Sequence, residues 1–479
     1  MRRARQQTSD DAQCTRNLSW RELAFVYGLS LLPRVIWAVW AHATPLSDMR
    51  EYDQLAMQLL GTGRFGLEGY LTWRTPVYPA MLAGVYGMVG HHVRAAMLLH
   101  VFLGAMTSVL LALLAARLIS RRAGLLAGVI HALSVTSILY VPLLVTEHVA
   151  VPLVVGALLS LTVMAGGKRA GAWAGLAGLL LGLAILVRPA CAFFLPGALA
   201  VAGYDFGARR WRLPLAGAIL LALALPLLAW VARNVRVGVG PVLSSSGDFI
   251  LYMGTQSDDP THWREDKLWE EFPSEAERSR IWRRAALHWI AGHPVGYLRL
   301  CGGRVWKLLG PQGDGYVAYW AWPTRANDAL LVSYWQGMPF PGEVARPPPA
   351  QLAAQARELR ARNARALSWP RAVAWPFLIT AMVLGLRRWR TLSPVVLPTF
   401  SYVLLLLATY VSFRLRELAG PGVVVMMAAL GEMGWTKLNR TGGGADAVPS
   451  QRQRGAAPPR GQAGRGRSLT TGRPMRHIA

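Results

Sequence analysis

The sequence predicts an all-α polytopic membrane protein, and three observations support this fold class. Of the 479 residues, 53% are hydrophobic and only 16% are charged, whereas charged residues make up about a quarter of an ordinary soluble chain. Apolar runs long enough to cross a hydrocarbon core, which takes roughly 20 residues, recur along the chain. Basic residues gather in every second short connection between these runs.

The apolar runs predict about ten transmembrane helices. They cover residues 22–43, 94–117, 123–141, 149–166, 171–187, 190–204, 213–232, 372–386, 393–411 and 418–435. The run 190–204 is the weakest of them, because it is short and contains Pro196. These runs predict an N-terminal membrane module over residues 22–232 and a C-terminal group of helices over residues 372–435.

The basic connections predict the orientation of the chain, because Lys and Arg are enriched in the cytoplasmic loops of membrane proteins. These connections lie at residues 121–122, 168–169, 209–212 and 387–390. Their alternation places residues 1–21 and 436–479 in the cytoplasm, and the loops 44–92 and 233–371 outside. We therefore expect a multi-pass protein of the cell membrane with both termini in the cytoplasm.

The net charge of +26 reflects this distribution rather than a nucleic-acid partner. Much of it comes from the cytoplasmic connections and from residues 436–479, which are rich in Gly, Pro, Arg, Gln and Ser. Such a composition cannot bury a core and predicts a disordered tail. The charge of this tail suits anionic lipid headgroups, so we expect no nucleic acid.

The long outer loop 233–371 differs in composition, since Trp, Tyr and Leu are spread through it. Within it, residues 275–310 predict one or two amphipathic helices broken at Pro294. Helices of this kind lie along a membrane surface. The loop therefore predicts a partly folded cap on the outer face.

The first outer loop begins with an amphipathic helix over residues 46–60, judged by the spacing of its apolar residues. Asp48 stands near the start of this helix, just beyond the first span. Its carboxylate could accept a proton from an incoming hydroxyl group. It could also cap the helix, with Glu51 completing a capping-box pair. The two roles are compatible, and the sequence leaves both open.

Arg74-Thr75-Pro76-Val77-Tyr78-Pro79 follows in the same loop. Its two prolines favour an extended backbone, which would fix the directions of the Arg74 and Tyr78 side chains. Arginine binds phosphate through planar, often bidentate hydrogen bonds. The alternative is an interfacial arginine that reaches toward lipid headgroups, with Tyr78 as a residue of the aromatic belt.

Further charged residues stand at the outward ends of other predicted spans. They are Glu147, Arg188, Arg233, Arg414 and Arg416. Each alone could be a flanking anchor, but together they would place several guanidinium groups and at least two carboxylates at one membrane face. This combination suits a polar, anionic ligand. The His and Cys spacings match no metal-binding pattern, and no nucleotide-binding or soluble-hydrolase motif occurs.

These residues carry a resemblance to a known family. The matching features are Asp48 and Tyr52 after the first span, the motif 74–79, Thr146-Glu147, Arg188-Pro189 and Arg233-Asn234. In this order the sequence resembles the GT-C membrane glycosyltransferases of family 39, of the protein mannosyltransferase and lipid A aminoarabinose transferase type. The chain departs from the family in three places: Asp48 lacks an adjacent second acid, Val77 replaces a Gly, and residues 414–419 lack a Tyr and a Pro.

The resemblance implies a GT-C-like fold and transfer of a sugar, with inversion, from a polyprenyl-phosphate donor. The acceptor would be a hydroxyl group of a lipid, glycan or protein at the outer face, and Asp48 would be the general base. The residues that would stabilise the lipid phosphate are Arg74, Arg188, Arg414 and Arg416. The pocket residues would be Tyr52, Tyr78, Glu147 and Arg233. The resemblance implies no certain cofactor and leaves a divalent metal open.

Two other function classes compete with a glycosyltransferase. A polytopic transporter or lipid flippase should have related repeats and acids near the middle of the membrane, whereas the clear acids of this chain lie at the outer edge. A non-catalytic relative that scaffolds envelope assembly would account for the departures at Val77 and residues 414–419.

Overall fold

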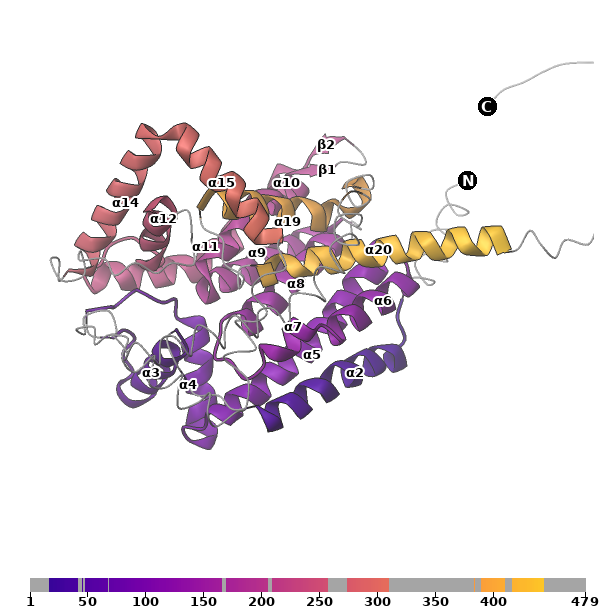
Figure 1. Ribbon diagram of the computed structural model, residues 1–479, viewed down its shortest axis with the longest axis horizontal. Helices are drawn as coiled ribbons and strands as arrows, with labels where there is room; N and C mark the ends of the chain where they lie inside the picture. The colour runs from indigo at the N-terminus through magenta and orange to yellow at the C-terminus, as the bar shows by residue number, and fades with distance from the viewer. Residues whose placement is uncertain are drawn as a thin grey trace, which may run out of the picture. The chain divides into compact units, whose positions relative to one another are not determined.

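The computed structural model describes residues 17–41, 45, 48–67, 69–165, 169–205, 209–256, 274–309, 383, 389–409 and 416–442 (Figure 1). Within these residues the regular structure is helical, apart from one antiparallel hairpin of strands β1 (Tyr204–Asp205) and β2 (Arg210–Trp211). Residues 1–434 form one compact unit and residues 435–479 a second.

The helices follow one another in a simple order along the chain. They are α2 (Trp20–Trp40), α3 (Asp48–Thr62), α4 (Val77–Val89), α5 (Val93–Leu118), α6 (Arg121–Ala132), α7 (Val135–Leu139), α8 (Glu147–Met164), α9 (Ala170–Val187), the 3₁₀ helix η1 (Pro189–Phe194), α10 (Leu195–Gly203), α11 (Leu213–Arg236), α12 (Ser246–Gln256), α14 (Glu275–Gly292), α15 (Pro294–Leu309), α19 (Trp389–Thr409) and α20 (Arg416–Gly442).

Six of the described helices are long and apolar enough to cross a membrane, namely α2, α5, α8, α9, α11 and α19. The predicted class of all-α membrane protein is thereby confirmed, but the number of about ten spans is not. The apolar helices α4, η1 with α10, and the apolar part of α20 are shorter. The predicted span 372–386 lies outside the described residues.

The prediction of one continuous span over 123–141 is wrong, because the chain forms α6 and α7 there. Ser134 separates them and caps α7 by accepting a hydrogen bond from the Ser137 amide at 3.4 Å. Arg34 of α2, which is fully buried, donates to the carbonyls of His131 at 3.1 Å and Ala132 at 2.9 Å. The guanidinium thus satisfies the Ala132 carbonyl at this helix break, where an unpaired group would be costly in hydrocarbon, while the His131 carbonyl also accepts from the Ser134 amide at 3.1 Å.

The predicted span 190–204 is also shorter than a membrane crossing. Pro196 lies in the first turn of α10, where its missing N–H costs no helical hydrogen bond. Gly197 follows, and a Cβ atom there would lie 2.3 Å from the carbonyl carbon of Leu397 in α19. The two helices therefore pack backbone against backbone, as small residues allow in membranes.

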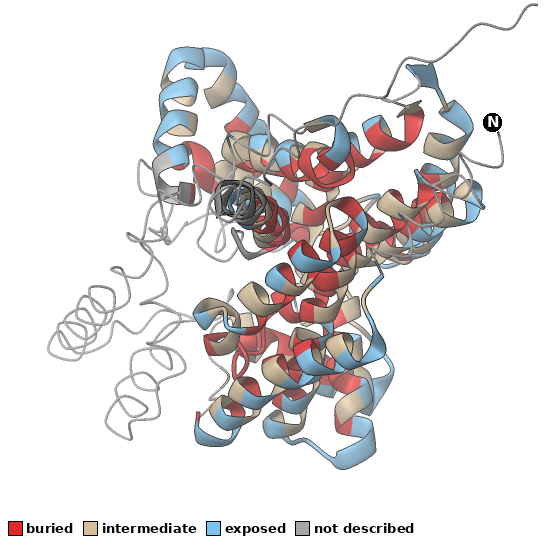
Figure 2. Cartoon of the chain, turned by 90° about the vertical axis from the view of Figure 1, so that its right-hand side faces the viewer, coloured by how far each residue is buried: buried red, intermediate tan, exposed pale blue. Residues whose placement is uncertain are grey.

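Glycines bring α9 and α11 together in the same way. A Cβ atom at Gly178 would lie 2.2 Å from the Ile219 carbonyl oxygen, and one at Gly182 would lie 2.9 Å from that of Leu223. In Figure 2 the buried residues gather between the helices, while their outward faces are intermediate or exposed. The outward face of α11 exposes several leucines, as expected of a helix that faces lipid.

Two predicted helical features of the segments 44–92 and 233–371 are confirmed. The amphipathic helix after the first span is α3, which buries Met49, Glu51, Tyr52, Leu55 and Ala56. The helical segment 275–310 consists of α14 and α15, which meet at Pro294. In the described residues α3 packs on α4 and α12 packs on α14, so each of these two segments has a helical pair of its own.

Candidate active site

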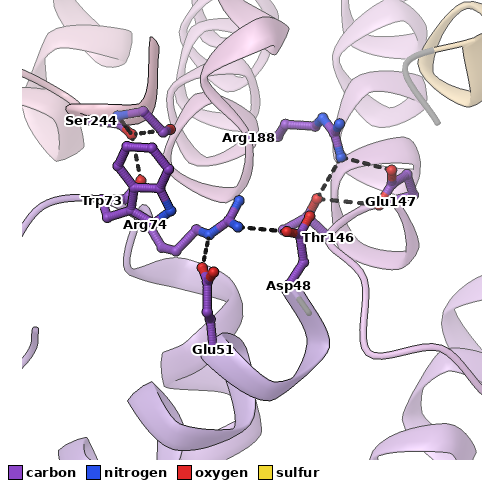
Figure 3. A network of polar contacts seen from close by, with 9 residues as sticks. Asp48, Glu51, Trp73, Arg74, Thr146, Glu147, Arg188 and Ser244 are labelled. Carbon is purple, nitrogen blue, oxygen red and sulfur yellow. Dashed lines mark hydrogen bonds and ion pairs between the residues drawn. The ribbon is translucent and has the colours of Figure 1, made fainter. Parts of the chain in front are cut away.

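A guanidinium group shared by two carboxylates lies at the centre of the candidate site (Figure 3). Arg74 donates from Nη2 to Oδ1 of Asp48 at 2.7 Å and from Nε to Oε2 of Glu51 at 2.6 Å. The two acids belong to the first turn of α3, and their spacing of three residues puts them on one helix face. One planar donor group therefore fixes the start of α3 to the loop that precedes α4.

The surroundings of Arg74 determine its charge. Burial lowers the pKa of the guanidinium, but the carboxylates of Asp48 and Glu51 outweigh burial and hold that pKa well above its ordinary value. A pKa raised in the folded state contributes stability that is fully present at every pH below the pKa of an unfolded arginine. Arg74 is therefore charged over the whole physiological pH range.

Two aromatic rings support the Arg74 side chain. The ring of Tyr52 lies 5.2 Å from the guanidinium carbon, and the ring of Tyr78 meets Tyr52 edge-on at 5.1 Å. His100 donates from Nδ1 to the Val141 carbonyl at 3.0 Å. Its Nε2 therefore accepts a hydrogen bond from the Tyr78 hydroxyl group at 3.1 Å. Tyr78 is fully buried, and its ring packs against Tyr52 on the side of the protein interior.

A second charged group is formed where α8 begins and α9 ends. Arg188 donates from Nη1 to Oε1 of Glu147 at 2.7 Å and to the Thr146 hydroxyl oxygen at 3.0 Å. The Thr146 hydroxyl in turn donates to Oε2 of Glu147 at 3.3 Å. Glu147 is almost completely buried, so its charge depends on this arginine.

One hydrogen bond links the backbone segments of the two groups. The Thr75 hydroxyl donates to the carbonyl of Val187 at 3.0 Å. Because Thr75 follows Arg74 and Val187 precedes Arg188, the two arginines lie on neighbouring segments, and Figure 3 shows both in one close view. The structure thus brings together Asp48, Arg74, Glu147 and Arg188 from three separate parts of the sequence.

Arg233 occupies a different position. Its Nη1 donates to the Leu71 carbonyl at 2.8 Å, its Nη2 donates to the Phe65 carbonyl, and its guanidinium stacks 5.0 Å from the Trp230 ring. It supports the backbone of the loop between α3 and α4, whereas the resemblance placed it among the pocket residues. Arg414 lies outside the described residues, and of Arg416 only the backbone at the start of α20 is described.

The sequence did not predict the role of Glu51 in this site. Its only expected role was in a capping box with Asp48, yet its side chain is buried and binds Arg74. The available signal was two acids three residues apart with an arginine in the same loop. That spacing alone does not distinguish a cap from an ion pair.

Metal-binding chemistry was left open by the sequence. Within the described residues, no three His, Cys, Asp or Glu side chains come together as a metal site would require. The acids of the site are balanced by arginine instead.

Residues 73–231 match the model of the dolichyl-phosphate-mannose-protein mannosyltransferase family. The family resemblance is confirmed over this segment. The matched segment includes Arg74, Glu147 and Arg188, whereas Asp48 and Glu51 lie before its first residue. No curated protein sequence matches the chain.

Two solved structures are distantly similar to this chain. The oligosaccharyltransferase of Archaeoglobus fulgidus, tethered with an acceptor peptide, is 12% identical over 90% of this chain and 52% of that chain, with a TM-score of 0.49. ArnT from Cupriavidus metallidurans, bound to undecaprenyl phosphate, is 16% identical over 88% of this chain and 79% of that chain, with a TM-score of 0.37. The chain thus spans about half the length of the oligosaccharyltransferase.

Proposed function

We propose that this protein is an integral-membrane glycosyltransferase that moves a sugar from a polyprenyl-phosphate donor to an acceptor hydroxyl group. The observation that carries the proposal is the joining of Asp48, Arg74, Glu147 and Arg188 into neighbouring charged groups. Most of this site lies in the segment that matches a family named for a lipid-phosphate sugar donor.

Asp48 is the general base of the proposed reaction. The acceptor oxygen attacks the anomeric carbon of the sugar while its proton passes to the Asp48 carboxylate. The bond from that carbon to the phosphate oxygen breaks, and the bonding electrons leave with the lipid phosphate. A single displacement of this kind inverts the configuration at the anomeric carbon.

Arg74 and Arg188 stabilise the negative charge that grows on the leaving phosphate. A guanidinium has five N–H donors, and within the described residues Asp48 and Glu51 accept from two of those of Arg74. The remaining donors suit phosphate oxygens. Phosphate binding would also compete for Arg74 with Asp48, which would free that carboxylate to act as the base.

We further propose the orientation in which this site faces outward and both termini are cytoplasmic. The outer loop 233–371 would form a cap that binds the acceptor, and the basic tail 436–479 would bind anionic lipid headgroups. The alternation of basic connections along the sequence supports this arrangement.

Mass spectrometry of envelope glycans and lipid-linked sugars tests the function directly. Cells without the gene should lack one glycan and accumulate its lipid-linked sugar, and the wild-type gene should restore both. The Arg74→Ala variant should accumulate in the membrane but restore neither the glycan nor the normal level of lipid-linked sugar. The Arg64→Ala variant, which changes an exposed arginine of the same loop, should restore both. Identical glycan profiles with and without the gene would reject the glycosyltransferase.

A further inference from the structure

Glu275 is a buried acid that the proposed reaction does not use. It is the first residue of α14, and only 7% of it is exposed. Its carboxylate accepts hydrogen bonds from the amide of Leu71 at 2.7 Å and from the amide of Thr72 at 3.1 Å. It also accepts from the Thr72 hydroxyl at 2.9 Å and from the Ser245 hydroxyl. All these donors converge on one side chain some 200 residues away from Thr72.

Other contacts join the same two parts of the chain. Ser245 donates its amide to the Thr72 carbonyl at 3.2 Å, and Ser244 donates its hydroxyl to the Trp73 carbonyl at 2.8 Å. Arg278, one turn after Glu275, donates to the Gly69 carbonyl at 2.9 Å. The backbone from Gly69 to Trp73 is therefore held by α14 and by the segment before α12.

Arg74 directly follows this held segment. Trp73 packs in an apolar cluster with Phe249, Met253 and Trp282 of α12 and α14, while the Arg74 side chain extends to α3. The described residues between α3 and α4 form no helix or strand, apart from one bridge between Leu67 and Tyr70. The position of Arg74 therefore depends on the side chains that bind residues 69–73, and Glu275 makes the largest number of these bonds.

We infer that Glu275 is a positioning residue for sugar transfer, which fixes the loop that presents Arg74 to the donor phosphate. The inference rests on the proposed function of Arg74. Only a carboxylate presents two acceptor oxygens to four converging donors, because a glutamine of the same shape has one acceptor oxygen and an amide that only donates. Replacing Glu275 by Gln should therefore leave buried donors unpaired and release the loop.

A double-mutant cycle on lipid binding tests this positioning. The probe is a polyprenyl phosphate without sugar, titrated into the purified full-length protein in detergent. Glu275→Gln should raise the Kd about tenfold, the cost of one lost charge-assisted contact. In an Arg74→Ala background it should raise the Kd less than twofold, because Glu275 acts through Arg74. Glu277→Gln, an exposed acid of the same helix turn, should leave the Kd unchanged.

Limited trypsin digestion tests the position of Arg74 in the absence of any ligand, through the rate of cleavage after this residue. The Arg74 side chain is only 16% exposed, so the bond after it should resist cleavage in the wild type and in Glu277→Gln. Glu275→Gln should make that bond cleave at least several times faster, while cleavage after the exposed Arg64 should not change.

The two experiments separate the inference from the proposed function. Unchanged cleavage after Arg74 in Glu275→Gln, or a Kd effect that is fully additive with Arg74→Ala, would overturn the positioning role. A wild-type protein that does not bind the polyprenyl phosphate would count against the proposed function, and the cleavage experiment would then decide the positioning role alone.

Discussion

At the scale of single residues, the site is built from charges that neutralise one another. Arg74 binds two acids and Arg188 binds a third. Buried charges are tolerated in this way because each partner replaces part of the water that the other has lost. The same pairing keeps Asp48 beside Arg74, so the proposed base and a proposed phosphate ligand occupy one place before any substrate arrives.

Asp48→Asn should abolish transfer while the protein still inserts and accumulates. Loss of a general base typically lowers a rate by about 10²–10⁴-fold, and Asn keeps the shape of the side chain without its basicity. The measurement is the rate at which membranes convert the accumulated lipid-linked sugar into glycan. Asp53→Asn is the matched control, since Asp53 lies on the same helix but binds Tyr86 and His91. Wild-type rates in Asp48→Asn would remove Asp48 as the base.

Arg74→Lys should be almost as harmful as Arg74→Ala. Lysine keeps the positive charge but lacks the planar fork that reaches Asp48 and Glu51 together. We expect a rate reduced by at least about tenfold, as for the loss of a strong transition-state contact, in the same membrane assay. A lysine variant with the wild-type rate would show that charge alone is sufficient at this position.

At the scale of secondary structure, two features shape the helices. Buried side chains bind backbone carbonyls at helix ends, and glycines allow two helices to come into close contact. Arg34 belongs to the first kind. It binds the end of α6, and Gly104 leaves the space for it, since a Cβ atom there would lie 2.7 Å from Nε of Arg34. Arg304 binds the Leu407 carbonyl near the end of α19 at 2.8 Å in a similar way.

Arg34→Met should destabilise the protein. Loss of the donor to the Ala132 carbonyl at the end of α6 should cost about 1–3 kcal/mol, and the apolar side chain cannot replace the guanidinium. Thermal unfolding in detergent measures the effect, with Ile36→Met, an exposed position of the same helix, as the control. Equal unfolding temperatures for the two variants would contradict the capping role.

Gly178→Ala should separate α9 from α11. The added methyl group would meet the Ile219 backbone at 2.2 Å, and overpacking of this kind typically costs about 1–3 kcal/mol. Gly175→Ala is the matched control, because a Cβ atom at Gly175 has no neighbour within 4 Å. Its effect should be neutral or slightly stabilising, since Ala favours helix. If both variants unfold at the same temperature, the close approach of these helices does not limit stability.

At the scale of the whole molecule, the basic connections predict the orientation of the chain, and packing brings the residues of the site together. The predicted topology can be tested with single cysteines in a chain whose native Cys14, Cys191 and Cys301 have been replaced. A membrane-impermeant maleimide should label Arg64→Cys in intact cells but should label Trp211→Cys only after permeabilisation. Both positions are exposed, so accessibility within the protein does not limit labelling. The opposite pattern would invert the topology.

Much of the fold follows from local sequence. Long apolar runs become helices because a chain in hydrocarbon must pair its own backbone groups, so α2, α5, α8, α9 and α11 lie close to their predicted ranges. The break between α6 and α7 could not be predicted in the same way. Its backbone groups are satisfied by Arg34, which comes from a helix about 100 residues earlier, and hydropathy along the chain does not report such a contact.

The sequence by itself determined the class of protein, most of its long apolar helices and the acids and arginines available at the ends of the predicted spans. Only the tertiary structure decided their partners: Arg74 with Asp48 and Glu51, Arg188 with Glu147, Arg233 with the loop backbone, and Glu275 with Thr72. The physical reason is that apolar periodicity acts over a few residues, whereas an arginine or a carboxylate can satisfy many different groups. Packing of segments up to about 200 residues apart selects one partner among them.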